Sequence, residues 1–172
     1  MTATASDITA WFGGRLPPDW TQHGAPTVVV DREEITVTLE IPAPTLADDA
    51  TDTERSETAA GRIAAFRAET RERRISIARE AEQRFERKVA WAVRTDGHTS
   101  LFTHIAVPAM TRLRQPERQV LDTLIASGVA KSRADALAWC VKLVGRHTDE
   151  WLTGLRSAID DVERIRAQGP SV

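Results

Sequence analysis

Residues 62–87 contain neither proline nor glycine and are rich in alanine, glutamate and arginine, which are strong helix formers. Spacings of three, four and seven residues place one set of their side chains on a single helix face: Ile63, Phe66, Thr70, Ile77, Ala81 and Phe85. Strand-like segments flank this stretch, two before it and two after it. The β-β-α-β-β order predicts an α+β fold, in which a long helix covers a small antiparallel sheet made of two hairpins.

Residues 27–30 and 35–41 form the first predicted hairpin. Apolar and polar residues alternate along 35–41, as they do in a strand with one buried face. The second hairpin joins residues 88–95 to residues 98–107 through Asp96-Gly97, a pair that favours the positive φ angles of a tight turn. Residues 43–61 are predicted to be an acidic linker that becomes helical near Asp52.

Residues 1–26 combine aromatic side chains with several glycines and prolines, and this composition predicts an irregular arm. Its aromatic residues, Trp11, Phe12 and Trp20, need a surface to pack against. Packing under the sheet is one interpretation, and binding of a partner is the other.

From Pro116 onward the pattern is helical. The first helix is predicted to begin near Pro116 and to end at Gly128, and Ser132 is a predicted N-cap for the second. The second helix is apolar almost all round, so we expect it to be buried at a subunit interface, with Gly145 as a potential interruption. A third helix is expected at about residues 148–168. These patterns divide the chain into residues 1–107, with the arm and sheet, and residues 108–172, a helical module.

The net charge of −2 over 172 residues hides an uneven distribution. Residues 1–60 carry 3 basic and 11 acidic residues, whereas residues 61–147 carry 17 basic and 9 acidic ones. The middle of the chain can therefore attract a polyanion such as a nucleic acid. Alternatively, the acidic part neutralises the basic part within the fold or across a dimer.

No motif in the sequence indicates catalysis. The four histidines are scattered without metal-ligand spacing, Cys140 lies in an apolar helical pattern, and no phosphate-binding glycine loop or serine hydrolase motif is present. We therefore expect no enzymatic activity, no cofactor and no metal. The sequence contains no apolar run long enough to span a membrane and no recognisable secretion signal, so a cytoplasmic location without membrane contact is expected.

The most specific pattern lies at about residues 107–144. A strand-like stretch ending at Leu113 precedes a helix with Leu121-Asp122, and a second helix opens with Ser132-Arg133. Leu113 and Leu121 stand eight residues apart. This region resembles the ribbon-helix-helix family of dimeric DNA-binding regulators, in which the short strand pairs with its twin across a two-fold axis. The chain as a whole is similar to members of an uncharacterised bacterial family.

The resemblance implies roles for five residues. Arg112 and Arg114 would approach the DNA groove or phosphates, while Lys131, Ser132 and Arg133 would clamp the DNA backbone at the start of the second helix. The two other ribbon positions that would face the groove, Met110 and Pro108, cannot read bases by hydrogen bonding.

The leading functional hypothesis is a regulatory or architectural DNA-binding protein that acts as a homodimer or higher homo-oligomer on double-stranded DNA. The alternative is a homo-oligomeric interaction or scaffold protein that binds a protein partner without binding DNA. An enzyme with a site between the sheet and the helices is a third reading. Pairing of the strand before Pro116 with a second copy, rather than with residues 88–95, would favour the first hypothesis.

Overall fold

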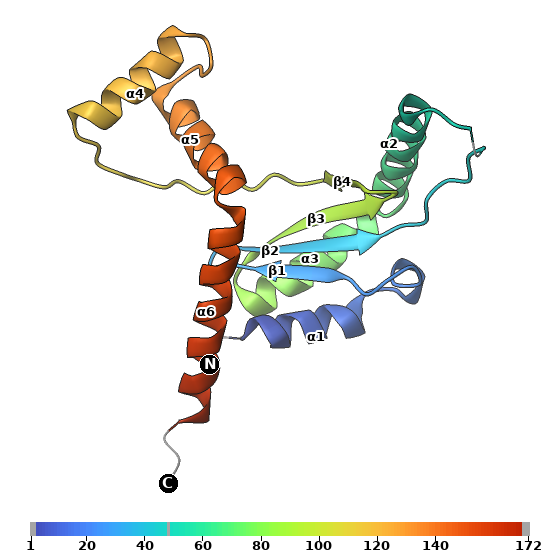
Figure 1. Ribbon diagram of the computed structural model, residues 1–172. Coiled ribbons are helices and arrows are strands. Elements are labelled where there is room, and N and C mark those ends of the chain that lie inside the picture. Colours follow the sequence, from blue (N-terminus) through green and yellow to red (C-terminus); the bar gives the residue numbers. More distant parts are fainter. Residues whose placement is uncertain (1–2, 48, 170–172) are drawn as a thin grey trace. The chain divides into compact units, whose positions relative to one another are not determined.

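The computed structural model describes residues 3–47 and 49–169. The chain divides into two compact units, Met1–Pro108 and Ala109–Val172. The first contains a four-stranded sheet with helices, and the second is helical (Figure 1). The predicted α+β class is confirmed.

The sheet of the first unit has the strand order β1-β2-β3-β4, with strands Thr27–Val30, Glu34–Glu40, Lys88–Thr95 and His98–Leu101. The pairs β1–β2 and β3–β4 are antiparallel hairpins, as predicted. However, β2 pairs with β3 in parallel, with Val37 opposite Trp91. The prediction of a purely antiparallel sheet is therefore wrong, because the helical connection between the hairpins returns the chain to the end of the sheet where β2 began.

The two hairpin turns have different chemistry. Asp96 and Gly97 adopt φ angles of 46° and 75°, the left-handed conformation that the Asp-Gly pair predicts. In the first hairpin the Asp31 carboxylate accepts hydrogen bonds from the amides of Glu33 and Glu34, at 2.8 and 2.6 Å. The last strand ends at Leu101, so the predicted extension of this strand to residue 107 is wrong.

The predicted helix over residues 62–87 is in fact two helices, α2 (Asp52–Glu69) and α3 (Arg71–Phe85), which meet at Thr70. The first begins within the predicted linker, where Thr51 and Glu54 form a reciprocal capping box. At the junction the Thr70 hydroxyl donates to the Phe66 carbonyl at 2.6 Å. A β-branched residue that bonds the preceding turn in this way weakens helix continuity.

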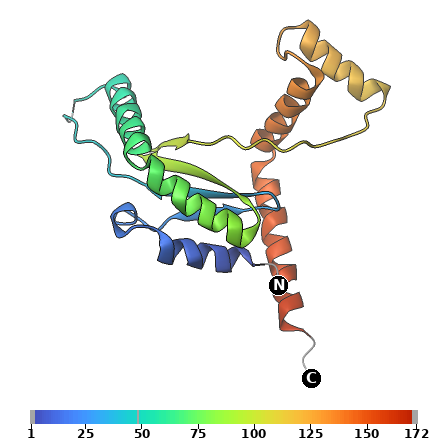
Figure 2. The ribbon, with the colours of Figure 1, turned by 180° about the vertical axis from the view of Figure 1, so that it is seen from behind.

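The predicted irregular arm is instead the helix α1 (Ala5–Arg15) followed by the short 3-10 helix η1 (Pro18–Trp20). Its aromatic residues pack under the sheet, so that interpretation of the arm is confirmed. Phe12 is fully buried, with its ring centroid 6.2 Å from that of Trp91, and Trp20 lies 6.0 Å from the same indole. Helices α1 and α3 cover the same face of the sheet (Figure 2).

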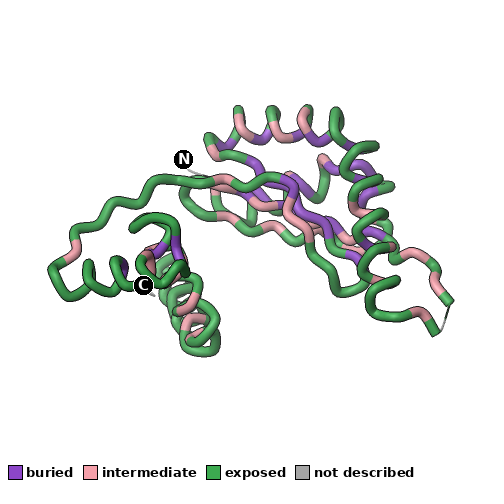
Figure 3. The backbone as a smooth tube through the Cα atoms, turned by 90° about the horizontal axis from the view of Figure 1, so that it is seen from above, coloured by how far each residue is buried: buried purple, intermediate pink, exposed green. Residues whose placement is uncertain are grey.

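The second unit consists of α4 (Gln115–Ala126), α5 (Arg133–His147) and α6 (Asp149–Gln168). The predicted boundaries at Gly128 and Ser132 are confirmed, and Gly128 has a φ of 77°. Gly145 does not interrupt α5. Pro170, predicted to end the last helix together with Gly169, lies outside the described residues. Figure 3 shows how little of this unit is buried compared with the sheet unit.

Candidate nucleic-acid interface

The segment of residues 103–114 is extended and has no strand partner within the described chain. Among the described residues, no backbone hydrogen bond joins residues 103–112 to the rest of the molecule. Met110 is 98% exposed, and Arg112 and Arg114 are also exposed. The segment thus does not belong to the intramolecular sheet, and its backbone donors and acceptors are available to another strand.

The end of this segment is anchored on α4 and α5. Leu113 packs against a small core made of Leu121, Ala130 and Ala136. Arg118 donates from its guanidinium to the Leu113 carbonyl at 2.8 Å, which fixes the entry into α4. Leu113 and the side chain eight positions later therefore share one apolar cluster, as the sequence pattern predicts.

The turn between α4 and α5 depends on the positive φ angle of Gly128. Its left-handed conformation closes α4, and the amides of Val129 and Ala130 both donate to the Leu124 carbonyl, at 3.0 and 3.2 Å. A side chain at position 128 would strain this conformation. The turn brings the start of α5 back toward α4.

The start of α5 has a reciprocal cap. The Ser132 hydroxyl oxygen accepts from the Asp135 amide at 3.2 Å, and the Asp135 carboxylate accepts from the Lys131 amide at 2.9 Å. The first two amides of α5, those of Arg133 and Ala134, have no acceptor among the described residues. Two free amides at the positive end of a 15-residue helix can hold an anion, although Asp135 adds a negative charge to the same turn.

Arg133 is engaged within the chain. Its Nε and one terminal nitrogen donate to the two carboxylate oxygens of Asp122, both at 2.7 Å, in a bidentate pair that joins α5 to α4. The pair lowers the pKa of Asp122 and raises that of Arg133, so both groups are charged throughout the neutral range. The sequence interpretation missed Asp122 as a partner that competes with DNA phosphate for Arg133.

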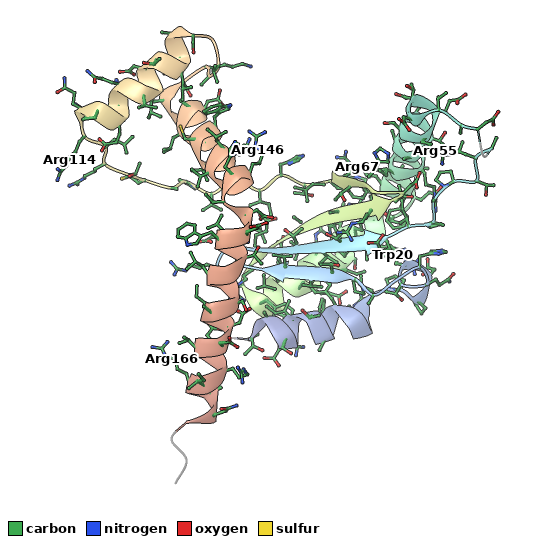
Figure 4. All side chains as sticks on the ribbon, in the orientation of Figure 1. Trp20, Arg55, Arg67, Arg114, Arg146 and Arg166 are labelled. Atoms are coloured by element: carbon green, nitrogen blue, oxygen red, sulfur yellow. The ribbon has the colours of Figure 1, made fainter. Side chains whose placement is uncertain are left out.

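The other predicted contact residues differ from Arg133. Arg112, Arg114 and Lys131 are exposed and form no ion pair with any described residue. Arg114 stands at the start of α4, where its side chain extends away from the helix (Figure 4). Residues 109–147 contain seven basic and three acidic residues, so the part of the chain with the predicted contacts carries net positive charge.

Large apolar side chains are exposed over α5 and α6. No residue of α6 is buried, and its exposed stripe repeats at spacings of three and four residues. The exposed apolar residues of the two helices are Val141, Val144, Trp151, Leu155, Ile159, Val162 and Ile165. Because only three of the unit's described residues are buried, the unit has a small core beside a large exposed apolar surface.

Residues with catalytic or ligand-binding chemistry are dispersed. Within residues 3–47 and 49–169, no group of three histidine, cysteine or carboxylate side chains could hold a metal ion. Cys140 is half-buried against the small core of the second unit. Across the same residues, each helix is too short or too polar to cross a lipid bilayer.

Comparison with known proteins gives two matches that follow the two units. Residues 6–101 match the family described as Rv1265-like protein, N-terminal domain, and residues 114–166 match the one described as Mb1296 C-terminal domain. Neither description mentions DNA. No solved structure gives a significant match to the chain.

Two curated relatives are similar over almost the whole chain. They are the uncharacterised proteins Mb1296 of Mycobacterium bovis and Rv1265 of Mycobacterium tuberculosis. Each is 56% identical over 168 residues, which covers 98% of this chain and 72% of the relative.

Proposed function

The chain belongs to the Rv1265-like family, and we propose that it is a homodimeric DNA-binding protein of regulatory or architectural type. In this proposal, residues 109–113 of two copies pair as a two-stranded ribbon, and the α4–α5 units of both copies flank it. The proposal assigns the chain no catalytic activity.

The observation that carries the proposal is the unpaired extended segment before α4. The backbone groups of residues 103–112 form no hydrogen bond with other described residues, and the segment leads through Leu113 into a two-helix unit whose second helix is capped by Ser132. A short strand with this connection lacks hydrogen-bond partners in one chain and gains them from a second copy. The same order of elements is the basis of the resemblance to ribbon-helix-helix proteins.

The charges of the described residues support a DNA contact. Arg112 and Arg114 lie in or next to the proposed ribbon, and neither has a carboxylate partner among the described residues. Arg112 can donate two hydrogen bonds to a guanine, and Lys131 can approach a phosphate beside the two free amides of α5. Met110 and Pro108 offer no such readout, so most of the affinity is expected to come from phosphates.

Titration of an arbitrary duplex of about 20 base pairs tests the proposal. The logarithm of the binding constant should fall linearly with the logarithm of the salt concentration. The Arg112→Ala/Arg114→Ala double variant removes four cations from a dimer, so the magnitude of the slope should decrease by roughly two to four. Fluorescence anisotropy at several salt concentrations measures both slopes.

A matched double variant controls for net charge. Arg32→Ala/Arg79→Ala removes two exposed arginines from the sheet unit and should leave the salt slope unchanged. An equal decrease of the salt slope in the two double variants would show that DNA binding depends only on net charge. It would contradict the assignment of Arg112 and Arg114 as DNA contacts. Absence of duplex binding at low salt would refute the proposed function.

The Asp122→Asn variant should bind DNA more tightly than the unmodified chain, by about threefold or more at low salt. The substitution releases the Arg133 guanidinium and removes a negative charge near the start of α5. Glu150→Gln removes the same charge from an exposed position of α6 and is the control. If Asp122→Asn binds no tighter than Glu150→Gln, Arg133 takes no part in the DNA contact.

A second candidate function is a homo-oligomeric interaction protein that does not bind DNA. Two carboxylates near the start of α5, that of Asp122 in α4 and that of Asp135 in α5, favour it because they oppose the approach of a phosphate. The exposed apolar stripe of α6 is compatible with both candidates. A dimer that binds no duplex at low salt would select this second candidate.

A further inference from the structure

Arg74, in the first turn of α3, is a buried arginine without a carboxylate partner. The residue is 7% exposed, and no described carboxylate lies within ion-pair distance of it. Its Nε donates to the Thr70 hydroxyl at 3.0 Å and one terminal nitrogen donates to the Arg67 carbonyl at 2.7 Å. The second terminal nitrogen has no acceptor among the described residues. An uncompensated buried charge of this kind is costly for a fold.

Two guanidinium groups converge on one aromatic ring. The guanidinium carbon of Arg74 lies 4.7 Å from the centroid of Phe102, and that of Arg67 lies 5.5 Å from the same centroid. Arg67 also donates to the Phe102 carbonyl at 3.3 Å. The ring and carbonyl hold both cations in place, but they supply no full negative charge.

Burial and the positive charges near Arg74 lower the pKa of its guanidinium group. Burial lowers the pKa of Arg74, and the neighbouring guanidinium groups of Arg67 and Arg71 lower it further. Arg71 is paired with the Glu72 carboxylate, whereas Arg67 and Arg74 have no carboxylate partner among the described residues, so two unneutralised like charges lie close together at the junction of α2 and α3. Figure 4 shows Arg67, a residue of the last turn of α2, close to β4.

Two hollows meet at Arg67, and neither has an acidic residue in its lining. One, of about 390 Å³, is lined by Arg67, Arg71, Arg74 and Thr103, among others. The other, of about 370 Å³, is lined by Arg67, His98, Thr99 and Ser100, among others. Three other surface hollows of the described chain each include at least one carboxylate.

We propose that these two hollows form a binding site for the phosphoryl groups of a small molecule, with Arg67 and Arg74 as the main ligands. Guanidinium groups match phosphate oxygens in geometry and charge, and the threonine and serine hydroxyls of the rim add donors. Two adjoining hollows provide room for a diphosphate. The aromatic ring is covered by guanidinium groups, so recognition rests on charge rather than on stacking. The site belongs to the first unit and does not depend on the function proposed for the second.

Isothermal titration of the full chain with pyrophosphate tests this site. We expect binding that Arg74→Met and Arg67→Gln each weaken by about tenfold or more, because each substitution removes charge-assisted hydrogen bonds. Arg79→Met removes an exposed arginine from the same helix and should leave the affinity unchanged. Absence of measurable heat with the unmodified chain, or an equal loss in Arg79→Met, would overturn the proposal.

A purely structural role for Arg74 makes a different prediction. If Arg74 serves only to join α2 to α3, Arg74→Met should lower the melting temperature and Arg67→Gln should not affect pyrophosphate binding. If the site is built for a ligand, Arg74→Met should melt no lower than the unmodified chain, because an uncompensated charge is removed. Pyrophosphate should then raise the melting temperatures of the unmodified chain and of Arg79→Met more than that of Arg74→Met.

A competition experiment distinguishes the two sources of phosphate. A short DNA duplex added to the pyrophosphate complex should leave pyrophosphate bound. If the duplex displaces pyrophosphate from the unmodified chain, and if Arg67→Gln no longer shows this competition, the cluster binds nucleic-acid phosphates. That result would overturn the small-molecule proposal. If Arg112→Ala/Arg114→Ala no longer binds the duplex but still binds pyrophosphate, the pyrophosphate site and the DNA interface are different sites.

Discussion

The Ile159→Asp variant is expected to sediment as a single chain of 19.0 kDa, whereas the unmodified chain should sediment at about twice that mass. Ile159 lies in the middle of the exposed stripe of α6 and is 57% exposed in one chain. In a dimer whose two α6 stripes pack together, a carboxylate buried at the centre of that apolar interface lacks a partner, so the dimer should weaken by about a hundredfold or more. Sedimentation equilibrium at several concentrations measures the change.

A charge on the opposite side of α6 is the control. Ser157→Asp adds the same carboxylate at an exposed position two residues away, where the side chain points to another face of the helix. This variant should dimerise normally. A concentration-independent mass of one chain for the unmodified protein would remove the basis for the proposed ribbon, and equal weakening by both variants would place the interface elsewhere.

Phe12→Ala should destabilise the sheet unit by about 3–5 kcal/mol. The phenyl ring is fully buried and makes edge-to-face contacts with Trp11 and Trp91, at centroid separations of 4.9 and 6.2 Å. Its removal leaves a cavity between α1 and the sheet and also forfeits the two aromatic contacts. Denaturant titration followed by tryptophan fluorescence and by far-UV circular dichroism measures the loss.

Phe12→Leu separates the two contributions. Leucine fills most of the cavity but cannot form the aromatic contacts, so this variant should lose about half as much stability as Phe12→Ala. A loss below about 1 kcal/mol for Phe12→Ala would mean that α1 contributes little to the stability of the unit. In that case the burial of the aromatic side chains of α1 would not be what holds α1 against the sheet.

Local sequence signals predicted the two hairpins and the helix boundaries at Gly128 and Ser132. Asp96-Gly97 has a conformation that few other pairs adopt readily, and Gly128 and Ser132 each satisfy backbone groups at a helix end. The alternation of Ile35, Val37 and Leu39 matches their burial in β2. These features depend on neighbours in the sequence, which is why they can be deduced without knowledge of the tertiary structure.

Features that depend on long-range packing were missed. The break at Thr70 lies where Arg67 and Arg74 contact the distant Phe102 ring, and α1 is stabilised by burial of its aromatic residues under the sheet. The parallel pairing of β2 and β3 was missed for a different reason. A strand, a helical connection and a second strand are the usual elements of a parallel pair, and the sequence contained that order.

The candidate interface was predicted in part. The sequence located the capped helix and the extended segment, because capping and apolar spacing are local properties. It did not predict the ion pair between Asp122 and Arg133, which lie eleven positions apart. An ion pair between two helices depends on the turn that joins them. The arginine cluster around Phe102 was also missed, because its residues come from α2, from α3 and from the segment after β4.

The parallel contact between β2 and β3 also governs the order of events in folding. Each hairpin can close locally, but the central contact joins Ile35 to Val89 and requires the whole helical connection to be in place. Loop closure over this distance is slow compared with hairpin formation. In a chain emerging from the ribosome, the edge of β2 that pairs with β3 therefore stays unpaired until β3 has been synthesised. That interval is when newly made chains are most exposed to aggregation.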